Sequence, residues 1–293
     1  MTNIKTENSK QAIKLVECPR DAMQGLHDFI PTETKVKYLN LLLQVGFDTL
    51  DFGSFVSPKA IPQMRDTEEV LAQLDLPSKT KLLAIVANLK GVENAVKHPE
   101  ISYLGFPFSI SETFQQRNTN SSIAQSLNTV QEMLELCNKH NKEAVVYLSM
   151  GFGNPYGDEW NTDIVTHWAN QLVEKGVKII SVADTVGVST PEKITAILPP
   201  LVQQFPTIEF GLHLHSTPQQ RLEKIEAAFS AGCTRMDSAL KGFGGCPMAA
   251  DDLTGNIATE EVIYYLNKQN KKLNLDMEKW REAVLFSSHI FHV

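Results

Sequence analysis

Two histidines separated by one residue, His213-Leu214-His215, follow a short apolar segment in the last third of the chain. If that segment is a strand, side chains two residues apart point to the same face, so the two imidazoles can bind one metal ion. The alternative is one buried, hydrogen-bonded histidine beside one solvated histidine. The pair alone does not decide between these interpretations.

A cation and a carboxylate, Arg20 and Asp21, follow the first apolar segment of the chain. An aspartate can bind a hard metal ion, and an arginine can hold an oxyanion through paired hydrogen bonds. Taken by themselves, however, the two residues favour a surface ion pair at a turn, because exposed charge pairs are common and contribute little to stability.

A glycine-rich segment, Gly-Phe-Gly-Gly-Cys-Pro, covers residues 242–247. Its glycines, Gly244 and Gly245 among them, permit a mobile loop with unusual backbone angles, and Cys246 in such a loop can be partly exposed and able to titrate. The alternative is a plain glycine turn with an incidental thiol. Asn256 lies just beyond, where its amide oxygen could bind a metal ion or its side chain could simply cap a helix.

Together these residues offer one carboxylate, two imidazoles and one amide oxygen, from Asp21, His213, His215 and Asn256. The set leaves two positions of an octahedral shell for the oxygens of a chelating substrate, which suits Mg²⁺ or Mn²⁺. Zinc would more often recruit thiolates or fewer ligands. The hypothesis requires a fold that brings four distant segments to one place.

Eight short apolar segments alternate with longer amphipathic ones, as expected for a parallel sheet with helical connections. Eight strand–helix units close a (β/α)₈ TIM barrel, whose functional residues lie at the carboxyl ends of the strands. An open doubly wound sheet alternates in the same way, but the strand count favours the barrel. We expect one domain over residues 1–293, with 1–11 flexible and an additional C-terminal helix. The predicted strands are 12–18, 47–52, 82–87, 101–107, 144–150, 177–183, 208–213 and 235–239, and the predicted helices are 32–45, 90–97, 123–140, 162–175, 191–205, 219–231, 260–267 and 277–288.

The composition limits which binding partners and which cellular compartment are expected. A net charge of −7 argues against nucleic acid or an anionic membrane as the main partner. Four scattered cysteines suit a reducing compartment, and the polar first residues lack the apolar stretch of a signal peptide, so we expect a cytoplasmic protein. The oligomeric state stays open, because the last helices could cap the barrel or form the face of a homodimer.

In order along the chain, these and further motifs resemble the 3-hydroxy-3-methylglutaryl-CoA lyase family from about residue 12 onward. The motifs are Arg20-Asp21 with Gln24, Ser54-Phe55-Val56-Ser57-Pro58-Lys59, Pro62-Gln63-Met64, Asn88-Leu89-Lys90-Gly91, Asn154-Pro155-Tyr156-Gly157, the segment from Asp184-Thr185 to Pro191, His213-Leu214-His215, Gly244-Gly245-Cys246-Pro247, and Gly255-Asn256 to Glu260. The Ser-Phe-Val-Ser-Pro-Lys and Gly-Gly-Cys-Pro motifs are specific to the lyases. The Arg-Asp and His-x-His motifs are shared with related metal-dependent aldolases and Claisen-type condensing enzymes.

The resemblance implies a retro-aldol cleavage that gives acetyl-CoA and acetoacetate from an acyl-CoA substrate. Asp21 would bind Mg²⁺ or Mn²⁺ and take part in catalysis, Arg20 would stabilise the enolate of the thioester, and Cys246 would act as general acid–base. The other implied metal ligands are His213, His215 and Asn256; the candidate substrate contacts are Gln24, Asp51, Ser54 and Thr185; and the candidate cations for the CoA phosphates, chosen because they follow predicted strands, are Lys59, Arg65, Lys90 and Arg117.

Several positions depart from the family pattern and keep two other functions open. Asp51 replaces a glutamate, Ala22 a glycine and Asn154 a cysteine, and the interval from Cys246 to Asn256 is one residue longer than expected. A related lyase or aldolase could act on another 3-hydroxyacyl-CoA or on a 4-hydroxy-2-oxoacid, although the Gly-Gly-Cys-Pro motif counts against it. An inactive barrel could serve as a binding module, but that hypothesis predicts damaged ligands, and all four are present.

Overall fold

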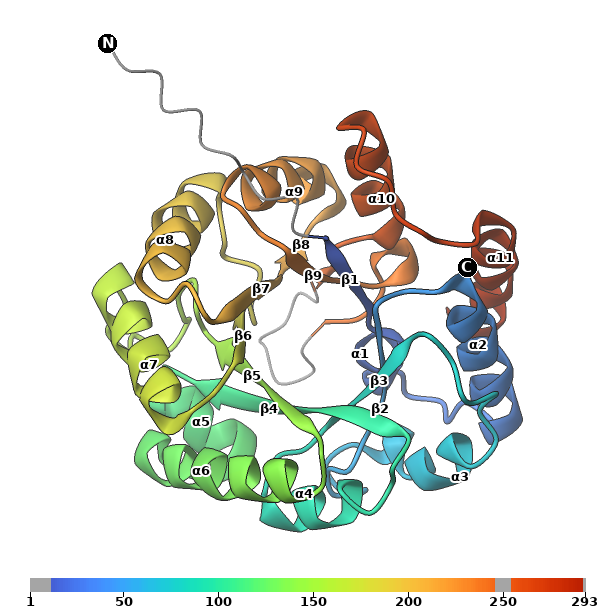
Figure 1. Ribbon diagram of the computed structural model, residues 1–293, viewed down its shortest axis with the longest axis horizontal. Coiled ribbons are helices and arrows are strands. Elements are labelled where there is room, and N and C mark those ends of the chain that lie inside the picture. Colours follow the sequence, from blue (N-terminus) through green and yellow to red (C-terminus); the bar gives the residue numbers. More distant parts are fainter. Residues whose placement is uncertain (1–11, 246–253, 292–293) are drawn as a thin grey trace.

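The computed structural model describes residues 12–245 and 254–291 and confirms the expected barrel. Eight parallel strands close into a ring in the order β1-β2-β3-β4-β5-β6-β7-β9, and helices surround the ring (Figure 1). The strands of the ring are β1 (Lys14–Glu17), β2 (Thr49–Ser54), β3 (Lys81–Ile85), β4 (Ile101–Ser109), β5 (Glu143–Ser149), β6 (Ile179–Ala183), β7 (Glu209–His213) and β9 (Arg235–Ser238).

Helices follow the strands largely where the amphipathic pattern predicts them. Helices α2 and α7 have the predicted bounds, because each ends at a glycine in the left-handed conformation and α7 begins after Asn161, whose side chain accepts the Ile164 N–H. The helices are α1 (Pro19–Gln24), α2 (Thr32–Val45), α3 (Thr67–Leu71), α4 (Leu89–Ala95), α5 (Glu112–Thr119), α6 (Ile123–Lys139), α7 (Thr162–Lys175), α8 (Pro191–Gln204), α9 (Arg221–Ser230), α10 (Thr259–Lys268) and α11 (Met277–Phe291).

Four features have no counterpart in the sequence prediction. Helices α1, α3 and α5 have 6, 5 and 8 residues, too few to give a clear helical period. Strands β8 (His215–Ser216) and β10 (Gly255–Asn256) form a separate antiparallel pair, in which Asn256 lies opposite His215. This pairing joins residues that are 41 positions apart in the case of Asn256 and His215, and no local pattern reveals it.

Two apolar clusters explain why the strands are apolar along their whole length. The larger cluster lies between the ring and the helices, and the smaller one fills the interior of the barrel with Leu83, Tyr103, Val145, Tyr147 and Ile179. Each strand therefore buries side chains on both of its faces.

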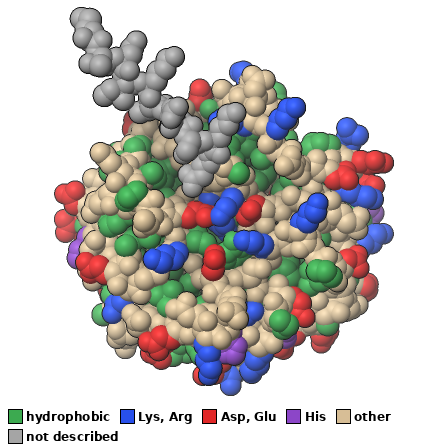
Figure 2. Space-filling view, viewed as in Figure 1, with side chains coloured by type: hydrophobic (Ala, Val, Ile, Leu, Met, Phe, Trp, Pro, Cys, Tyr) green, Lys and Arg blue, Asp and Glu red, His purple; other side chains and the backbone are tan. Residues whose placement is uncertain are grey.

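Charged side chains close the end of the barrel at which the strands begin. The Nζ atom of Lys14 lies 2.5 Å from Glu209, and the buried Arg235 lies 3.3 Å from the same carboxylate. Red and blue side chains accordingly meet near the centre of the face shown in Figure 2. In this fold the functional residues lie at the opposite end, where the strands finish, so a substrate site is expected there.

The expected C-terminal helix is present as α11, which packs along α2 with the rings of Tyr38 and Phe286 stacked at 6.3 Å. Within residues 12–245 and 254–291, no helix is long and apolar enough to cross a membrane. That residues 1–293 form one domain stays a prediction, and residues 1–11 lie outside the described part of the chain.

Candidate active site

The two histidines meet at the carboxyl end of the barrel, although they do not share one strand. His213 ends β7 and His215 begins β8, and both side chains are buried. Their Nε2 atoms lie 3.1 Å apart. Two unprotonated ring nitrogens at this distance repel one another, so the arrangement requires a proton or a cation between them.

Asp21 completes a cluster that fits a divalent metal ion. Its Oδ2 atom lies 3.9 Å from His215 Nε2, and one ligand atom from each of Asp21, His213 and His215 can be chosen so that all lie within 4.8 Å of one another. Two neighbouring ligands of an octahedral ion would be about 3.0 Å apart, which is close to the separation of the histidine nitrogens. These three side chains could therefore hold a metal ion through a mixed set of oxygen and nitrogen atoms.

Charge and burial separate the pKa values of these three groups. Burial, reinforced by His213, lowers the pKa of His215 to about 4, so its imidazole is neutral and keeps a lone pair for a metal. Burial also lowers the pKa of His213, but its hydrogen bond to Asp237 and the charge on Asp21 outweigh burial and raise it. Burial raises the pKa of Asp21, yet Arg20 and the histidines bring it down to about 2.

Arg20 is held rigidly beside the cluster on the short helix α1. Its Nε and Nη2 atoms donate to the buried carboxylate of Asp51 at 2.6–3.2 Å, and its Nη1 atom donates to Asp21 at 3.1 Å and to Gln24 at 2.9 Å. One Nη2 hydrogen has no acceptor among the described residues. The guanidinium is therefore fixed in orientation and can still donate to a substrate oxygen.

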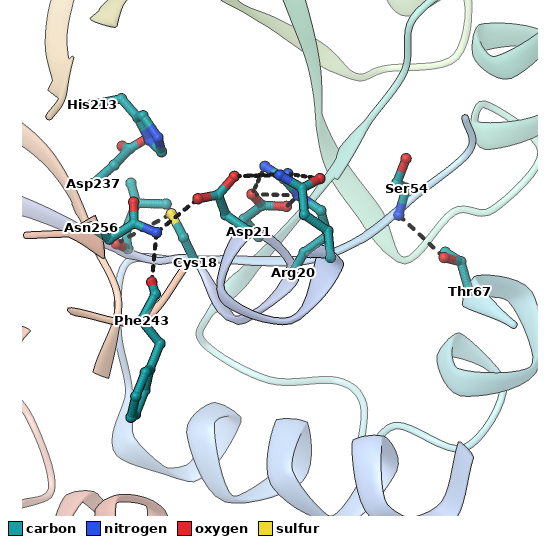
Figure 3. Close-up of polar contacts among 12 residues, drawn as sticks. Cys18, Arg20, Asp21, Ser54, Thr67, His213, Asp237, Phe243 and Asn256 are labelled. Carbon is teal, nitrogen blue, oxygen red and sulfur yellow. Dashed lines mark hydrogen bonds and ion pairs between the residues drawn. The ribbon is translucent and has the colours of Figure 1, made fainter. Parts of the chain in front are cut away.

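Asn256 presents its amide nitrogen, not its oxygen, to the cluster. Its Nδ2 atom donates to Asp21 at 2.7 Å and to the carbonyl of Phe243 at 2.8 Å (Figure 3). Both partners are acceptors, so the orientation of the amide is well defined. Binding of a metal by the Asn256 oxygen stays a prediction, and it requires the amide to turn.

The glycine-rich segment approaches the cluster closely. Gly244 has a φ of +98°, and a Cβ atom there would lie 2.7 Å from Asn256 Nδ2 and 2.9 Å from the carbonyl oxygen of Asp21. Gly245 also has a positive φ, of 150°. The unusual backbone angles expected from the sequence are thus present, and they allow backbone contact with the metal cluster. Cys246 itself lies outside the described residues.

The sequence analysis missed Asp237, which orients His213. Asp237 lies on β9 and is buried, and its Oδ2 atom accepts a hydrogen bond from His213 Nδ1 at 3.1 Å. This contact places the remaining Nε2 lone pair toward His215 and the metal position. An acidic residue inside a buried strand was a visible signal for such a role.

Asp237→Ala is expected to weaken Mn²⁺ binding by about 10- to 100-fold, because His213 would lose the partner that fixes its tautomer and ring orientation. Titration of Mn²⁺ followed by electron paramagnetic resonance measures this affinity. Asp237→Asn keeps an acceptor oxygen and should lose less Mn²⁺ affinity. His215→Ala removes a proposed ligand and shows how much affinity is lost without one. An unchanged affinity in Asp237→Ala would contradict the orienting role.

A cavity of about 360 Å³ opens beside the cluster and contains several of the predicted substrate contacts. Ser54 and Thr185 line it, and the hydroxyl of Thr185 accepts the backbone N–H of Met150 at 3.0 Å. Its polar and charged lining includes Arg20, Asp21, Gln24, His213, His215 and Arg117. Asp51 acts through Arg20, because its carboxylate is buried beneath that guanidinium.

Helix α5 supplies one wall of the cavity through Phe114, Arg117 and Asn118. Asp158, on the loop after β5, fixes the start of this helix, because its carboxylate accepts from the Ser111 hydroxyl at 2.5 Å and from the Thr113 N–H at 3.0 Å. A carboxylate at this end of a helix also meets a favourable dipole. The wall is thereby held in place against the barrel.

The fold and the site together define a (β/α)₈ barrel with a candidate metal centre at the carboxyl ends of its strands. A family model described as HMGL-like matches residues 12–285, and the chain belongs to this family. The hydroxymethylglutaryl-CoA lyase of Bacillus subtilis is 33% identical over 265 residues, which cover 90% of this chain and 88% of that protein.

Further relatives carry the same description. The cytoplasmic 3-hydroxy-3-methylglutaryl-CoA lyase of Rattus norvegicus is 34% identical over 274 residues, which cover 92% of this chain and 79% of that protein. The solved structure of an HMG-CoA lyase from Acinetobacter baumannii in complex with coenzyme A and 3-methylmalate is 28% identical, with a TM-score of 0.89. That match covers 100% of this chain and 93% of the solved chain. The resemblance stated from the sequence is therefore confirmed.

Proposed function

We propose that this chain is a divalent-metal-dependent carbon–carbon lyase that cleaves 3-hydroxy-3-methylglutaryl-CoA to acetyl-CoA and acetoacetate. The observation that carries the proposal is the meeting of Asp21, His213 and His215 beside Arg20 at the wall of one cavity. The family to which the chain belongs and the names of its relatives support this choice of reaction.

Asp21, His213 and His215 would hold Mg²⁺ or Mn²⁺, with Asn256 as a fourth ligand. When bound, the metal supplies a Lewis acid that makes the tertiary hydroxyl of the substrate easier to deprotonate. Asp21 is ionised and His215 is neutral at neutral pH, as metal ligands must be. Gln24 helps to keep Asp21 in place, since its Nε2 atom donates to the carboxylate at 2.9 Å.

Cleavage of the bond between C2 and C3 leaves an electron pair on the thioester half of the substrate. Arg20 would stabilise the resulting enolate oxygen through its remaining Nη2 hydrogen, and Asp51 keeps the guanidinium from turning away. As C3 becomes the ketone of acetoacetate, its hydroxyl proton would pass to solvent. Cys246 would donate a proton to C2, which yields acetyl-CoA, and its thiolate would then regain a proton from solvent.

The direct test is acetoacetate release from 3-hydroxy-3-methylglutaryl-CoA by the purified chain. We expect turnover that stops in EDTA and returns when Mg²⁺ or Mn²⁺ is added. Metal binding without turnover would indicate that the substrate is another acyl-CoA or a ketoacid. Absence of both turnover and metal binding would favour the inactive barrel.

We further propose that Arg117 contacts an anionic group of the substrate. Of the four cations considered for the CoA phosphates, Arg117 lines the cavity, and its guanidinium lies 4.7 Å from the centre of the Tyr156 ring. No described carboxylate or carbonyl accepts a hydrogen bond from it. The charge and the hydrogen-bond donors of Arg117 are therefore available to a ligand.

Arg117→Gln is expected to raise the KM for the acyl-CoA by about tenfold with little change in kcat, because a charge-assisted hydrogen bond is lost. Steady-state kinetics measures both constants. Arg65→Gln is the matched control, since Arg65 also stacks on an aromatic ring, that of Phe29 at 3.4 Å, but does not line the cavity. Equal effects of the two substitutions on KM would contradict the contact.

The remaining expectations about partners and location stay predictions. The relatives include proteins named cytoplasmic and proteins named mitochondrial, so a cytoplasmic location is supported only in part. A homodimer, and the lack of nucleic acid or membrane among the partners, are still to be tested by sizing and binding measurements.

A further inference from the structure

Glu17 is a buried carboxyl for which the proposed reaction gives no use. It is the last residue of β1 and has no measurable exposure. Within the described part of the chain, no lysine, arginine or histidine lies within ion-pair distance of it. A buried carboxylate without a cation is costly, so an uncharged carboxyl is favoured here.

The hydrogen bonds of Glu17 reach the two chain segments that frame the metal cluster. Its Oε1 atom accepts the Leu240 N–H at 2.8 Å, at the start of the turn η3 (Leu240–Gly242) that leads to Gly244. Its Oε2 atom lies 2.6 Å from the hydroxyl of Thr259, at the start of α10. One carboxyl thereby joins β1 to the segments on both sides of residues 246–253.

The segments joined by Glu17 are the ones that carry Gly244 and Asn256. The backbone of Ala239 is bonded to the segment of Asn256 at two points, through its N–H to the Ile257 carbonyl at 3.0 Å and through its carbonyl to the Thr259 N–H at 3.1 Å. A shift of Leu240 or Thr259 would therefore displace Asn256, whose Nδ2 atom donates to Asp21 at 2.7 Å.

The contacts around Glu17 accommodate a proton on its carboxyl. Thr259 has a single hydroxyl hydrogen but lies within hydrogen-bond distance of both Glu17 and the Ser238 hydroxyl, the latter at 2.9 Å. When the Glu17 Oε2 carries a proton, Glu17 donates to Thr259 and Thr259 donates to Ser238. This arrangement leaves no charge in the row of three side chains.

The surrounding titratable groups reinforce the uncharged form. Burial raises the pKa of Glu17 to about 8, with a smaller contribution from the nearby Glu260 on α10 and against the hydrogen bonds from Thr259 and Leu240, which lower it. Tyr38 on α2 stays neutral, because burial raises its pKa well above the usual value. Lys241 is the nearest cation in the turn, and its Nζ atom donates to Ser288 at 3.1 Å instead.

We propose that Glu17 is a positioning residue, whose uncharged carboxyl joins β1 to Leu240 and Thr259 and so holds Gly244 and Asn256 against Asp21. This role rests on the proposed function in one respect, namely that Asn256 belongs to the metal site. The proposal makes two separate statements, one about the proton and one about the geometry. Each has its own measurement.

The proton is tested by thermal unfolding of the wild type and Glu17→Gln between pH 5 and pH 9. The carboxyl of the unfolded chain ionises near the ordinary glutamate pKa of 4.5, whereas burial holds the pKa of the folded one at about 8. Between these values the folding constant of the wild type should fall by about tenfold per pH unit from this group alone, and the fall should end above pH 8.

Glu17→Gln should lack this loss, because glutamine reproduces the protonated acid by accepting from Leu240 and donating to Thr259. Its melting temperature should therefore rise relative to the wild type as the pH increases from 5 to 8. Parallel pH curves for the two proteins would overturn the uncharged state of Glu17.

The geometry is tested by Mn²⁺ affinity and by hydrogen exchange of residues 254–259 in Glu17→Ala and Glu17→Gln. We expect Glu17→Ala to bind Mn²⁺ at least about tenfold more weakly and to exchange these amides faster, while Glu17→Gln resembles the wild type. Leu172→Ala is the control, because it opens a cavity in α7 and lowers the melting temperature without touching this network.

The outcomes separate the positioning role from simple loss of stability. Weaker binding in Glu17→Ala but not in an equally destabilised Leu172→Ala supports the proposal, and equal affinities overturn it. If the wild type itself binds no Mn²⁺, the proposed metal site fails instead. In that case the positioning role of Glu17 is tested by hydrogen exchange alone. Exchange rates of residues 254–259 that are the same in Glu17→Ala and the wild type would overturn it.

Discussion

Arg20→Lys is expected to lower kcat for cleavage of 3-hydroxy-3-methylglutaryl-CoA by about 100-fold or more, with the affinity for Mn²⁺ nearly unchanged. A lysine keeps the charge next to Asp21 but offers one flexible ammonium group in place of a planar fork. It cannot bind both oxygens of Asp51, remain beside Asp21 and still aim a donor at the thioester oxygen. Steady-state kinetics and Mn²⁺ titration measure the two quantities.

The same substitution at Arg65 is the control, because Arg65 is exposed and does not line the cavity. Arg65→Lys should leave kcat unchanged. A fall in Mn²⁺ affinity of Arg20→Lys as large as its fall in kcat would show that Arg20 mainly supports Asp21. Retention of full kcat would remove Arg20 from the stabilisation of the enolate.

The barrel could be predicted from the sequence because its signals are local. Most strands of the ring lie in apolar segments, and helices such as α2 and α7 end at glycines. The short helices α1, α3 and α5 were not predicted, since eight or fewer residues complete little more than two turns of the helical period. The pairing of β8 with β10 is a contact between distant residues and leaves no local pattern.

The metal cluster could be proposed from residue types, but its geometry could not. The sequence predicted that strand spacing would turn both imidazoles to one face at the end of the strand 208–213. In the structure the chain leaves the barrel between His213 and His215, and their Nε2 atoms still converge at 3.1 Å. Asp237 and Glu17 were not singled out, because an acidic residue in a buried strand signals a role but does not show which residues are its partners. Those partners, His213 and Thr259, come from other parts of the chain.

Cys246→Ala is expected to lower kcat by about 10²- to 10⁴-fold, the range that a positioned general acid contributes, while Mn²⁺ still binds. Cys246 lies outside the described residues, but the preceding glycines are close to the metal cluster, with Gly244 packed against Asp21 and Asn256. The predicted acid–base role requires the thiol to protonate the substrate carbon without being a metal ligand.

Cys137→Ala is the matched control, because Cys137 is buried on α6 and its pKa is raised by burial to about 11, so its thiol cannot serve in proton transfer near neutral pH. It should keep nearly full kcat. If Cys246→Ala lost Mn²⁺ binding together with turnover, the thiol would belong to the metal shell. If it kept full turnover, another group or water would have to protonate the enolate, and the acid–base role of Cys246 would be wrong.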